Sequence, residues 1–262
     1  LLNAELYHQS NTEFFNFYSS VSDERVQAAL KDIRSRQIDL GGFSADEMTT
    51  AARYYAALQD WIATYRIDAL AIRCWPDHLM LTGQWPYLAL SLLQTDGYAA
   101  VQEGDTDGAL SALIVEAAGL GPVYLSDWLE HDRDTCAIWH TGVIPLQFCE
   151  EPQPRLANHF NNKRPMVVEG TIPSGIDVTV FRLWYANGSY HLVAFEGETV
   201  QPTRHLLGTN GLVKAHNVDL QRWFRGALRL GMPHHVSVVR GHVSEILERI
   251  AYHMKVQWHN VE

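Results

Sequence analysis

Three short polar clusters interrupt otherwise apolar stretches of the sequence, and each carries a side chain that can bind a metal ion or move a proton. They occupy residues 102–105, 125–128 and 233–235. In each cluster a carboxylate or an imidazole stands where a predicted strand meets a loop or turn. Two carboxylates and a histidine that converge on one point would hold a hard divalent cation and leave positions open for a substrate. The metal-site hypothesis therefore depends on whether the three clusters meet in space.

Glu103 follows a short apolar run, residues 98–102, that we interpret as a buried parallel strand. In open α/β sheets, ligands bind beyond the carboxyl ends of the parallel strands, so this position suits a ligand. The acidic loop after Glu103 opens a helix predicted for residues 108–118. We interpret Asp105 and Asp107 as capping or first-turn residues of that helix, which its dipole favours. For Glu103 itself, spacing alone leaves a functional and a structural role open.

Asp127 follows a predicted strand, residues 122–125, at the junction between two differently patterned halves of the chain, where binding pockets are common. An aspartate in a turn after a strand is the structural alternative. His140 ends another predicted strand and is either a ligand, a substrate contact or a histidine satisfied at a strand end. His234 and His235 precede the apolar residues 236–239, in a strand-like run predicted for residues 235–240. Adjacent strand residues point to opposite faces, so at most one of this pair should face a given site.

The first third of the chain is predicted to be helical. Ser22 can cap one helix, and residues 44–47 form a capping box before a long amphipathic helix that reaches about Tyr65. Two short apolar strands then alternate with two helices. In chain order, these elements cover residues 68–73, 86–93, 98–102 and 108–118. This alternation is typical of a parallel sheet flanked by helices.

The pattern changes from Gly121 onward, where short strand-like runs are separated by turn signals. The pair Asn187-Gly188 between two such runs is a strong hairpin signal. This half is therefore predicted to be mainly antiparallel, as a barrel or a sandwich. A closing helix is predicted at residues 243–254, capped by Ser244 or by the Gly-His pair that precedes it.

The two patterns together predict an α/β fold in two domains. Residues 1–119 would form a parallel-sheet central domain that is truncated at its amino terminus, and residues 120–262 a mainly antiparallel, β-barrel-like carboxy-terminal domain. A length of 262 residues suffices for one large domain or two modest ones. The chain starts with Leu1 rather than Met, which suggests that further sequence precedes it.

The composition is that of an ordinary globular protein, with a hydrophobic fraction of 47% and a formal net charge of −10. This acidic balance argues against a nucleic-acid partner and is compatible with a neutral sugar or a metal ion. No apolar run approaches the roughly 20 residues of a membrane helix, and the start shows no signal-peptide pattern. Three irregularly spaced cysteines predict reduced thiols in a cytoplasmic protein. Walker, dinucleotide-binding and Gly-x-Ser-x-Gly signatures are absent.

Taken together in chain order, the clusters resemble the L-fucose isomerase and L-arabinose isomerase superfamily, and most closely its L-fucose-isomerase-like branch. The resemblance covers nearly the whole chain. The matching stretches are residues 71–76, 103–105 with 108–110, 121–127, 139–142 and 233–235. Full-length members carry further amino-terminal α/β sequence. The resemblance therefore implies that this chain is the later part of the central domain followed by the carboxy-terminal β domain.

The resemblance implies an enzyme that interconverts aldoses and ketoses through a cis-enediol with Mn²⁺ or another divalent cation. Glu103 and Asp127 would be the two metal-binding and catalytic carboxylates. His235 would be the imidazole ligand, because the family ligand matches the second position of the histidine pair. In the arabinose branch a second histidine follows the second acid, and His140 is its nearest counterpart here. That branch has Glu where Asp127 stands, so Asp127 favours the fucose-like side.

Four further residues are predicted to contact the sugar: His140, Trp75, Trp128 and His234. Core packing is the alternative for the tryptophans. The expected partners are a monosaccharide, of the L-fucose or D-arabinose type, and further copies of the chain in a homo-oligomer, with no nucleic acid and no membrane. Full activity would need residues outside this chain. Two alternatives remain: an isomerase of another sugar, such as sulfoquinovose, and a non-catalytic sugar-binding or regulatory relative.

Overall fold

Three helices open the chain in the computed structural model, which describes residues 4–149 and 153–261. They are α1 (Asn11–Ser20), α2 (Asp23–Ser35) and α3 (Ala45–Tyr65). A serine caps each amino terminus by accepting a backbone N–H, as expected for a residue with this preference. These serines are Ser10, Ser22 and Ser44. The predicted cap at Ser22 and the capping box at residues 44–47 are confirmed.

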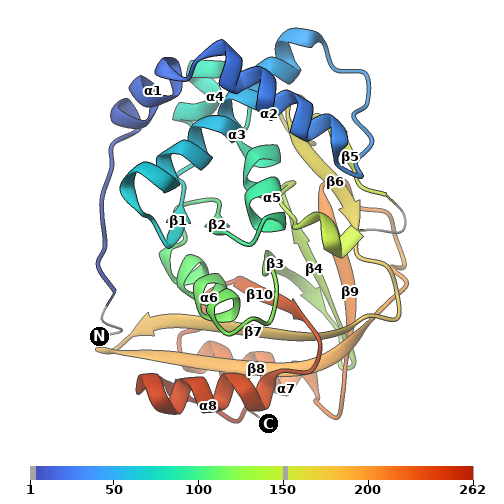
Figure 1. Cartoon of the computed structure of the whole chain (residues 1–262). Helices are drawn as coiled ribbons and strands as arrows, with labels where there is room; N and C mark the ends of the chain where they lie inside the picture. Colours follow the sequence, from blue (N-terminus) through green and yellow to red (C-terminus); the bar gives the residue numbers. More distant parts are fainter. Residues whose placement is uncertain (1–3, 150–152, 262) are drawn as a thin grey trace.

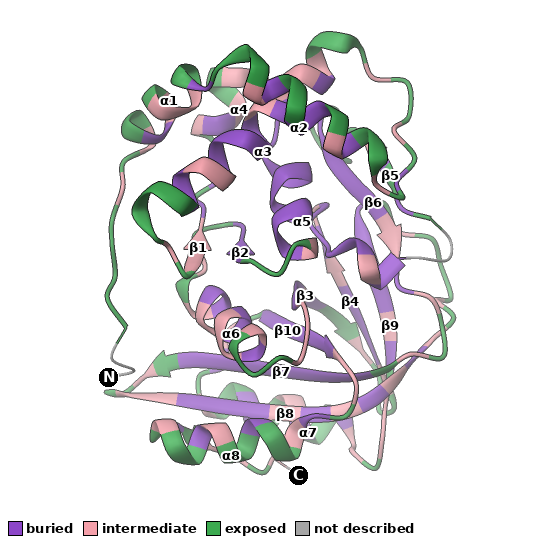
Figure 2. Ribbon diagram, in the orientation of Figure 1, coloured by how far each residue is buried: buried purple, intermediate pink, exposed green. Residues whose placement is uncertain are grey.

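A small parallel sheet follows the three helices. Strand β1 (Ala69–Ala71) pairs in parallel with β2 (Ala99–Val101), and Ala69 lies opposite Ala99. Between them run α4 (Asp77–Thr82) and α5 (Tyr87–Thr95), and α6 (Thr106–Ala117) follows β2. Figure 2 shows α5 buried along most of its length, because it packs between this sheet, α3 and the strands beyond. The predicted alternation of strands and helices is confirmed, although the sheet is small.

The second half forms a closed antiparallel barrel of six strands (Figure 1). In spatial order these strands are β8, β7, β10, β3, β4 and β9, and a β8–β9 pairing closes the ring. Their bounds are β3 (Tyr124–His131), β4 (Thr135–His140), β7 (Asp177–Ala186), β8 (Ser189–Val200), β9 (Thr209–Ala215) and β10 (His235–Arg240). Closure favours the barrel over the sandwich, and the hairpin at Asn187-Gly188 is confirmed.

Shorter elements extend or cover this barrel. They are η1 (Leu146–Cys149), β5 (Arg155–Ala157), β6 (Val167–Thr171), α7 (Leu220–Arg229), α8 (Ser244–Met254) and β11 (Gln257–Trp258). Helix α7 was not predicted. The predicted cap at Ser244 is wrong, because Ser244 is the first helical residue and Val243 precedes it without a side-chain cap.

Helix α6 packs directly against the barrel. Its Ala112 and Val115 share one apolar cluster with Phe181 and Leu183 of β7 and with Leu247 of α8. Because α6 is pressed against the barrel wall, the loop that precedes it lies over the start of β10. The boundary predicted at residue 119 stays a prediction, since the halves on either side of it share this packing.

Asp127 lies inside a strand, whereas the sequence placed it after one. Strand β3 runs on from Tyr124 to His131 and pairs with both β10 and β4. The polar pair Ser126-Asp127 resembled a turn, but cross-strand hydrogen bonds on both sides continue the strand through it.

The cysteines Cys74, Cys136 and Cys149 are buried free thiols. Within residues 4–149 and 153–261, no helix is both long enough and apolar enough to cross a membrane.

Closure of the barrel predicts one glycine position that does not tolerate a side chain. A Cβ at Gly197 would collide with the backbone oxygen of Lys214 at the β8–β9 seam, where Gly197 pairs with Ala215. We expect Gly197→Ala to lower the free energy of unfolding by about 1–3 kcal/mol, as overpacking does. Urea denaturation measures this change. Gly42→Ala is the matched control, because no atom lies within 4 Å of its added methyl group. Equal midpoints for the two variants would contradict a tight seam.

Candidate functional site

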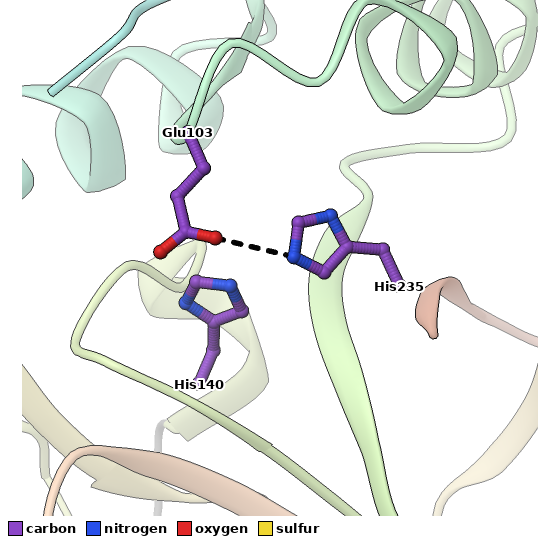
Figure 3. Close-up of side chains that lie close together, drawn as sticks. All are labelled: Glu103, His140 and His235. Atoms are coloured by element: carbon purple, nitrogen blue, oxygen red, sulfur yellow. Dashed lines mark ion pairs between the residues drawn. The ribbon is translucent and has the colours of Figure 1, made fainter. Parts of the chain in front are cut away.

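His235 is the centre of the candidate site. It opens β10 directly opposite Asp127 of β3 in the antiparallel register. Its Nε2 atom lies 3.3 Å from Oε2 of Glu103 and 3.5 Å from Oδ1 of Asp127. Figure 3 shows the imidazole of His235 pointing toward the carboxylate of Glu103. The structure thus brings together all three residues that the sequence assigned to a metal.

Asp105 holds the other side of the His235 ring. Its Oδ2 atom lies 2.8 Å from Nδ1 of His235, and its two oxygens accept hydrogen bonds of 2.7 and 2.9 Å from Arg182. The side chains of Asp105 and Arg182 are only 10% and 3% exposed. A carboxylate accepts hydrogen bonds, so Nδ1 of His235 carries the proton. The Nε2 atom, which is buried without a hydrogen-bond partner, is left to face the two acids.

Asp105 is also the N-cap of α6, as the sequence predicted. It accepts the backbone N–H of Gly108 at 2.8 Å. A Cβ at Gly108 would lie 2.7 Å from Oδ2 of Asp105, so only glycine lets the carboxylate sit so close. The contact with His235 was missed, because the capping role already explained the residue. The available signal was Arg182, a charged residue in an apolar strand that needs a buried partner.

The backbone at Glu103 aims its side chain at the barrel. Glu103 and Gly104 both adopt the left-handed conformation, with φ angles of 63° and 67°. This region is uncommon for a residue with a Cβ, and such residues concentrate at functional sites. The N–H of Gly104 donates to the carbonyl of Ile72 at 2.9 Å, which anchors the loop to the end of β1. The Glu103 side chain remains 29% exposed, so a ligand can reach its carboxylate.

His140 ends β4 and lies beside His235, with the ring centroids 5.5 Å apart. One ligand atom from each of Glu103, His140 and His235 lies within 4.8 Å of the others. Asp127, His234 and His235 form a second group by the same measure. His140 is buried, and its Nε2 atom has no hydrogen-bond partner among the described residues.

His234 also approaches the acids. Its Nε2 atom lies 3.4 Å from Oδ1 of Asp127, and its side chain is 73% exposed. The expectation that only one of the two adjacent histidines faces the site is wrong. Strand β10 begins at His235, so His234 precedes it and is not bound by the alternation of a strand.

The two predicted tryptophan contacts have different outcomes. Trp75, just before α4, is 57% exposed, and its contact with a sugar stays a prediction. Trp128 is buried in an aromatic stack, with its ring centroid 5.5 Å from Trp223 and 4.8 Å from Phe224. It follows Asp127 in β3 and packs into the core, so the structure does not bring Trp128 to the group.

Charges in the metal-free site are set by burial and by neighbours. Burial opposes protonation of His235, but its ion pairs with Asp105 and Glu103 and the charge of Asp127 raise its pKa to about 9. The ion pair with His235 lowers the pKa of Glu103 despite partial burial. Burial lowers the pKa of His140 to about 4. At neutral pH the metal-free site therefore holds a charged His235, a neutral His140 and an ionised Glu103.

No protein-family model matches the sequence. The chain is similar to curated proteins named sulfoquinovose isomerase. The protein from Alkalicoccus urumqiensis is 27% identical over 209 residues, which are 76% of this chain and 46% of that protein. The Priestia megaterium protein is 26% identical over 206 residues, covering 77% and 46%. That of a Clostridium species is 25% identical over 243 residues, covering 91% and 54%.

The chain thus spans about half the length of the curated relatives it matches. All three relatives are sugar isomerases by name. None of these three is named for L-fucose or L-arabinose, so the superfamily stays a resemblance.

The His235–Asp105 bond makes a testable prediction for the metal-free protein. Asp105→Asn removes the negative partner that favours charged His235, so the pKa of His235 should fall from about 9 by about one unit or more. An NMR titration of the ring protons measures it. Because the folded pKa is raised, the stability from this group is complete below pH ~6.5 and is lost as pH rises through about 9.

Asp107→Asn is the control, because Asp107 lies in the same helix turn and accepts the backbone N–H of Tyr185 instead of touching His235. In the Asp107→Asn variant, the pKa of His235 should stay near the wild-type value. An Asp105→Asn variant that also left this pKa unchanged would contradict the assigned role of Asp105.

Proposed function

We propose that this chain carries the active site of a metal-dependent aldose–ketose isomerase. The observation that carries the proposal is the convergence of Glu103 and Asp127 on the partnerless Nε2 atom of His235. The names of the relatives support the same reaction class.

The donor set fits Mn²⁺ or another divalent cation. Two carboxylates and one imidazole nitrogen suit an ion of this hardness and leave positions open. Buried nitrogen atoms normally have a hydrogen-bond or metal partner. The Nε2 atom of His235 is buried and has no hydrogen-bond partner in the part of the chain that the structure describes. Asp105 supports the fit, because metal-binding histidines usually donate their other N–H to a carboxylate or carbonyl. The raised pKa of His235 belongs to the metal-free state, so loading the site would release a proton.

A divalent cation bound there would supply Lewis-acid polarisation of the sugar carbonyl. We assign the removal of the carbon-bound proton to Glu103, because its carboxylate is ionised at neutral pH and partly exposed. It removes the proton from C2, the C–H electron pair forms the C1–C2 double bond, and the electron pair of the carbonyl double bond moves to O1. Asp127 relays the O2 proton to O1 in this cis-enediol intermediate, so that the negative charge passes to O2. Return of the first proton from Glu103 to C1 then leaves the carbonyl at C2.

A sulfonated sugar is the first candidate substrate. The relatives are named for sulfoquinovose, whereas the sequence resemblance implied the L-fucose or D-arabinose type. Arg73 is exposed next to the loop of Glu103, with its Cβ 3.9 Å from where a Cβ of Gly104 would lie. Among residues 4–149 and 153–261 it forms no ion pair. An exposed guanidinium without an ion-pair partner among these residues, on a residue that lies against the Glu103 loop, suits an anionic sulfonate.

An isomerisation assay on the full-length protein tests this proposal. With Mn²⁺ we expect ketose formation, fastest with sulfoquinovose among a panel that includes L-fucose and D-arabinose. EDTA should abolish the reaction and added Mn²⁺ should restore it. Folded protein that forms no ketose from any sugar, with or without Mn²⁺, would favour the non-catalytic sugar-binding alternative.

The assignment of Glu103 makes a separate prediction. Glu103→Gln should lower kcat by about 10²–10⁴-fold, because the amide cannot accept the carbon-bound proton. The exchange of the C2 proton with D₂O should fall by a similar factor. Glu130→Gln is the control, because Glu130 is 56% exposed and pairs with Arg204 on the surface. Undiminished exchange in Glu103→Gln would assign the carbon-bound proton to another group.

A further inference from the structure

The tautomer of His140 is defined by its backbone neighbour. The N–H of Thr141 donates to Nδ1 of His140 at 2.8 Å. A backbone N–H can only donate, so Nδ1 must present a lone pair. The side-chain amide nitrogen of Gln102 lies 3.1 Å from the same atom, on a buried side chain, and can add a second donor. The ring proton of His140 therefore sits on Nε2.

His235 takes the opposite tautomer once metal loading releases its Nε2 proton. Its Nδ1–H donates to Asp105, so Nε2 would then present a lone pair between Glu103 and Asp127. Two neighbouring imidazoles thus offer different chemistry to one space. The Nε2 of His235 can bind a cation, and the Nε2–H of His140 can donate a hydrogen bond.

The Nε2–H group of His140 points into the site and has no acceptor among the described residues. Its Nε2 atom is buried and has no hydrogen-bond partner among the described residues. In Figure 3 the Nε2 edge of this ring faces Glu103 and His235, while the Nδ1 edge faces away. A buried donor without a partner is costly, so this arrangement suits an acceptor that arrives with a ligand.

We infer that His140 is a catalytic hydrogen-bond donor to a sugar oxygen and not a metal ligand. It would hold the oxygen that gains negative charge as the neighbouring proton is removed, in the manner of an oxyanion donor. The cation then belongs to Glu103, Asp127 and His235. The sugar as acceptor rests on the proposed function, whereas the tautomer does not.

A ligand role for His140 would require the other tautomer. Its Nε2 could bind a cation only with the proton on Nδ1, and that proton would then point at the N–H of Thr141. Two donors would face each other across 2.8 Å. The group of Glu103, His140 and His235 is therefore close in space without being a complete ligand set.

Mn²⁺ binding to variants of the full-length protein separates the two roles. Free Mn²⁺ is counted by its EPR signal during titration. We expect His235→Gln to weaken Mn²⁺ binding by at least about 10-fold, as loss of a ligand should. His140→Gln should bind Mn²⁺ within about threefold of wild type. A His140→Gln variant that lost Mn²⁺ as His235→Gln does would overturn the inference.

Two further readouts complete the test. Neutron diffraction of Mn²⁺-loaded wild-type crystals should show a proton on Nε2 of His140, and a proton on Nδ1 would overturn the inference even if the variants misfold. With the best sugar of the panel, His140→Gln should lower kcat by about 10²–10³-fold. Unchanged kcat would also overturn it. If wild type forms no ketose, the isomerase proposal fails alone, because the EPR and neutron results still decide the chemistry of His140.

Discussion

The structure of the site depends on one buried carboxylate. Asp105 accepts hydrogen bonds from three elements: the first turn of α6, Arg182 of β7 and His235 of β10. These contacts join the helix after the small parallel sheet to two barrel strands. Without Asp105 the charge of Arg182 would be buried and uncompensated, which is strongly destabilising. The group that orients His235 therefore also fixes the loop that carries Glu103.

Two different structural constraints position the two carboxylates of the site. Sheet register sets Asp127 opposite His235, and an antiparallel pair can change this only by slipping along its whole length. The approach of Glu103 is set instead by two left-handed residues and a single hydrogen bond to the end of β1. One carboxylate is thus held by a sheet and the other by a tight turn.

Sequence reasoning succeeded where a local pattern was enough. Alternating strands and helices, the Asn187-Gly188 hairpin and the approximate places of Glu103 and His235 all follow from short-range signals. It failed where a role depends on a distant partner. In the sequence, capping of α6 alone accounts for Asp105, and its buried contact with Arg182 becomes evident only in the fold. It also failed at His234: the strand was predicted to begin at His235, as it does, but the alternation of strand side chains was applied to a residue that precedes the strand.

Barrel closure has a consequence for association between copies of the chain. Each strand of the closed ring has a neighbour on both sides, so the open strand edges of the larger sheet are confined to its two ends. In the part of the chain that the structure describes, those ends are β5 and β11, of three and two residues. A bridge from Asp39 covers part of β5. Such short edges give little template for strand addition to the larger sheet, so another subunit would have to bind the barrel through side-chain surfaces.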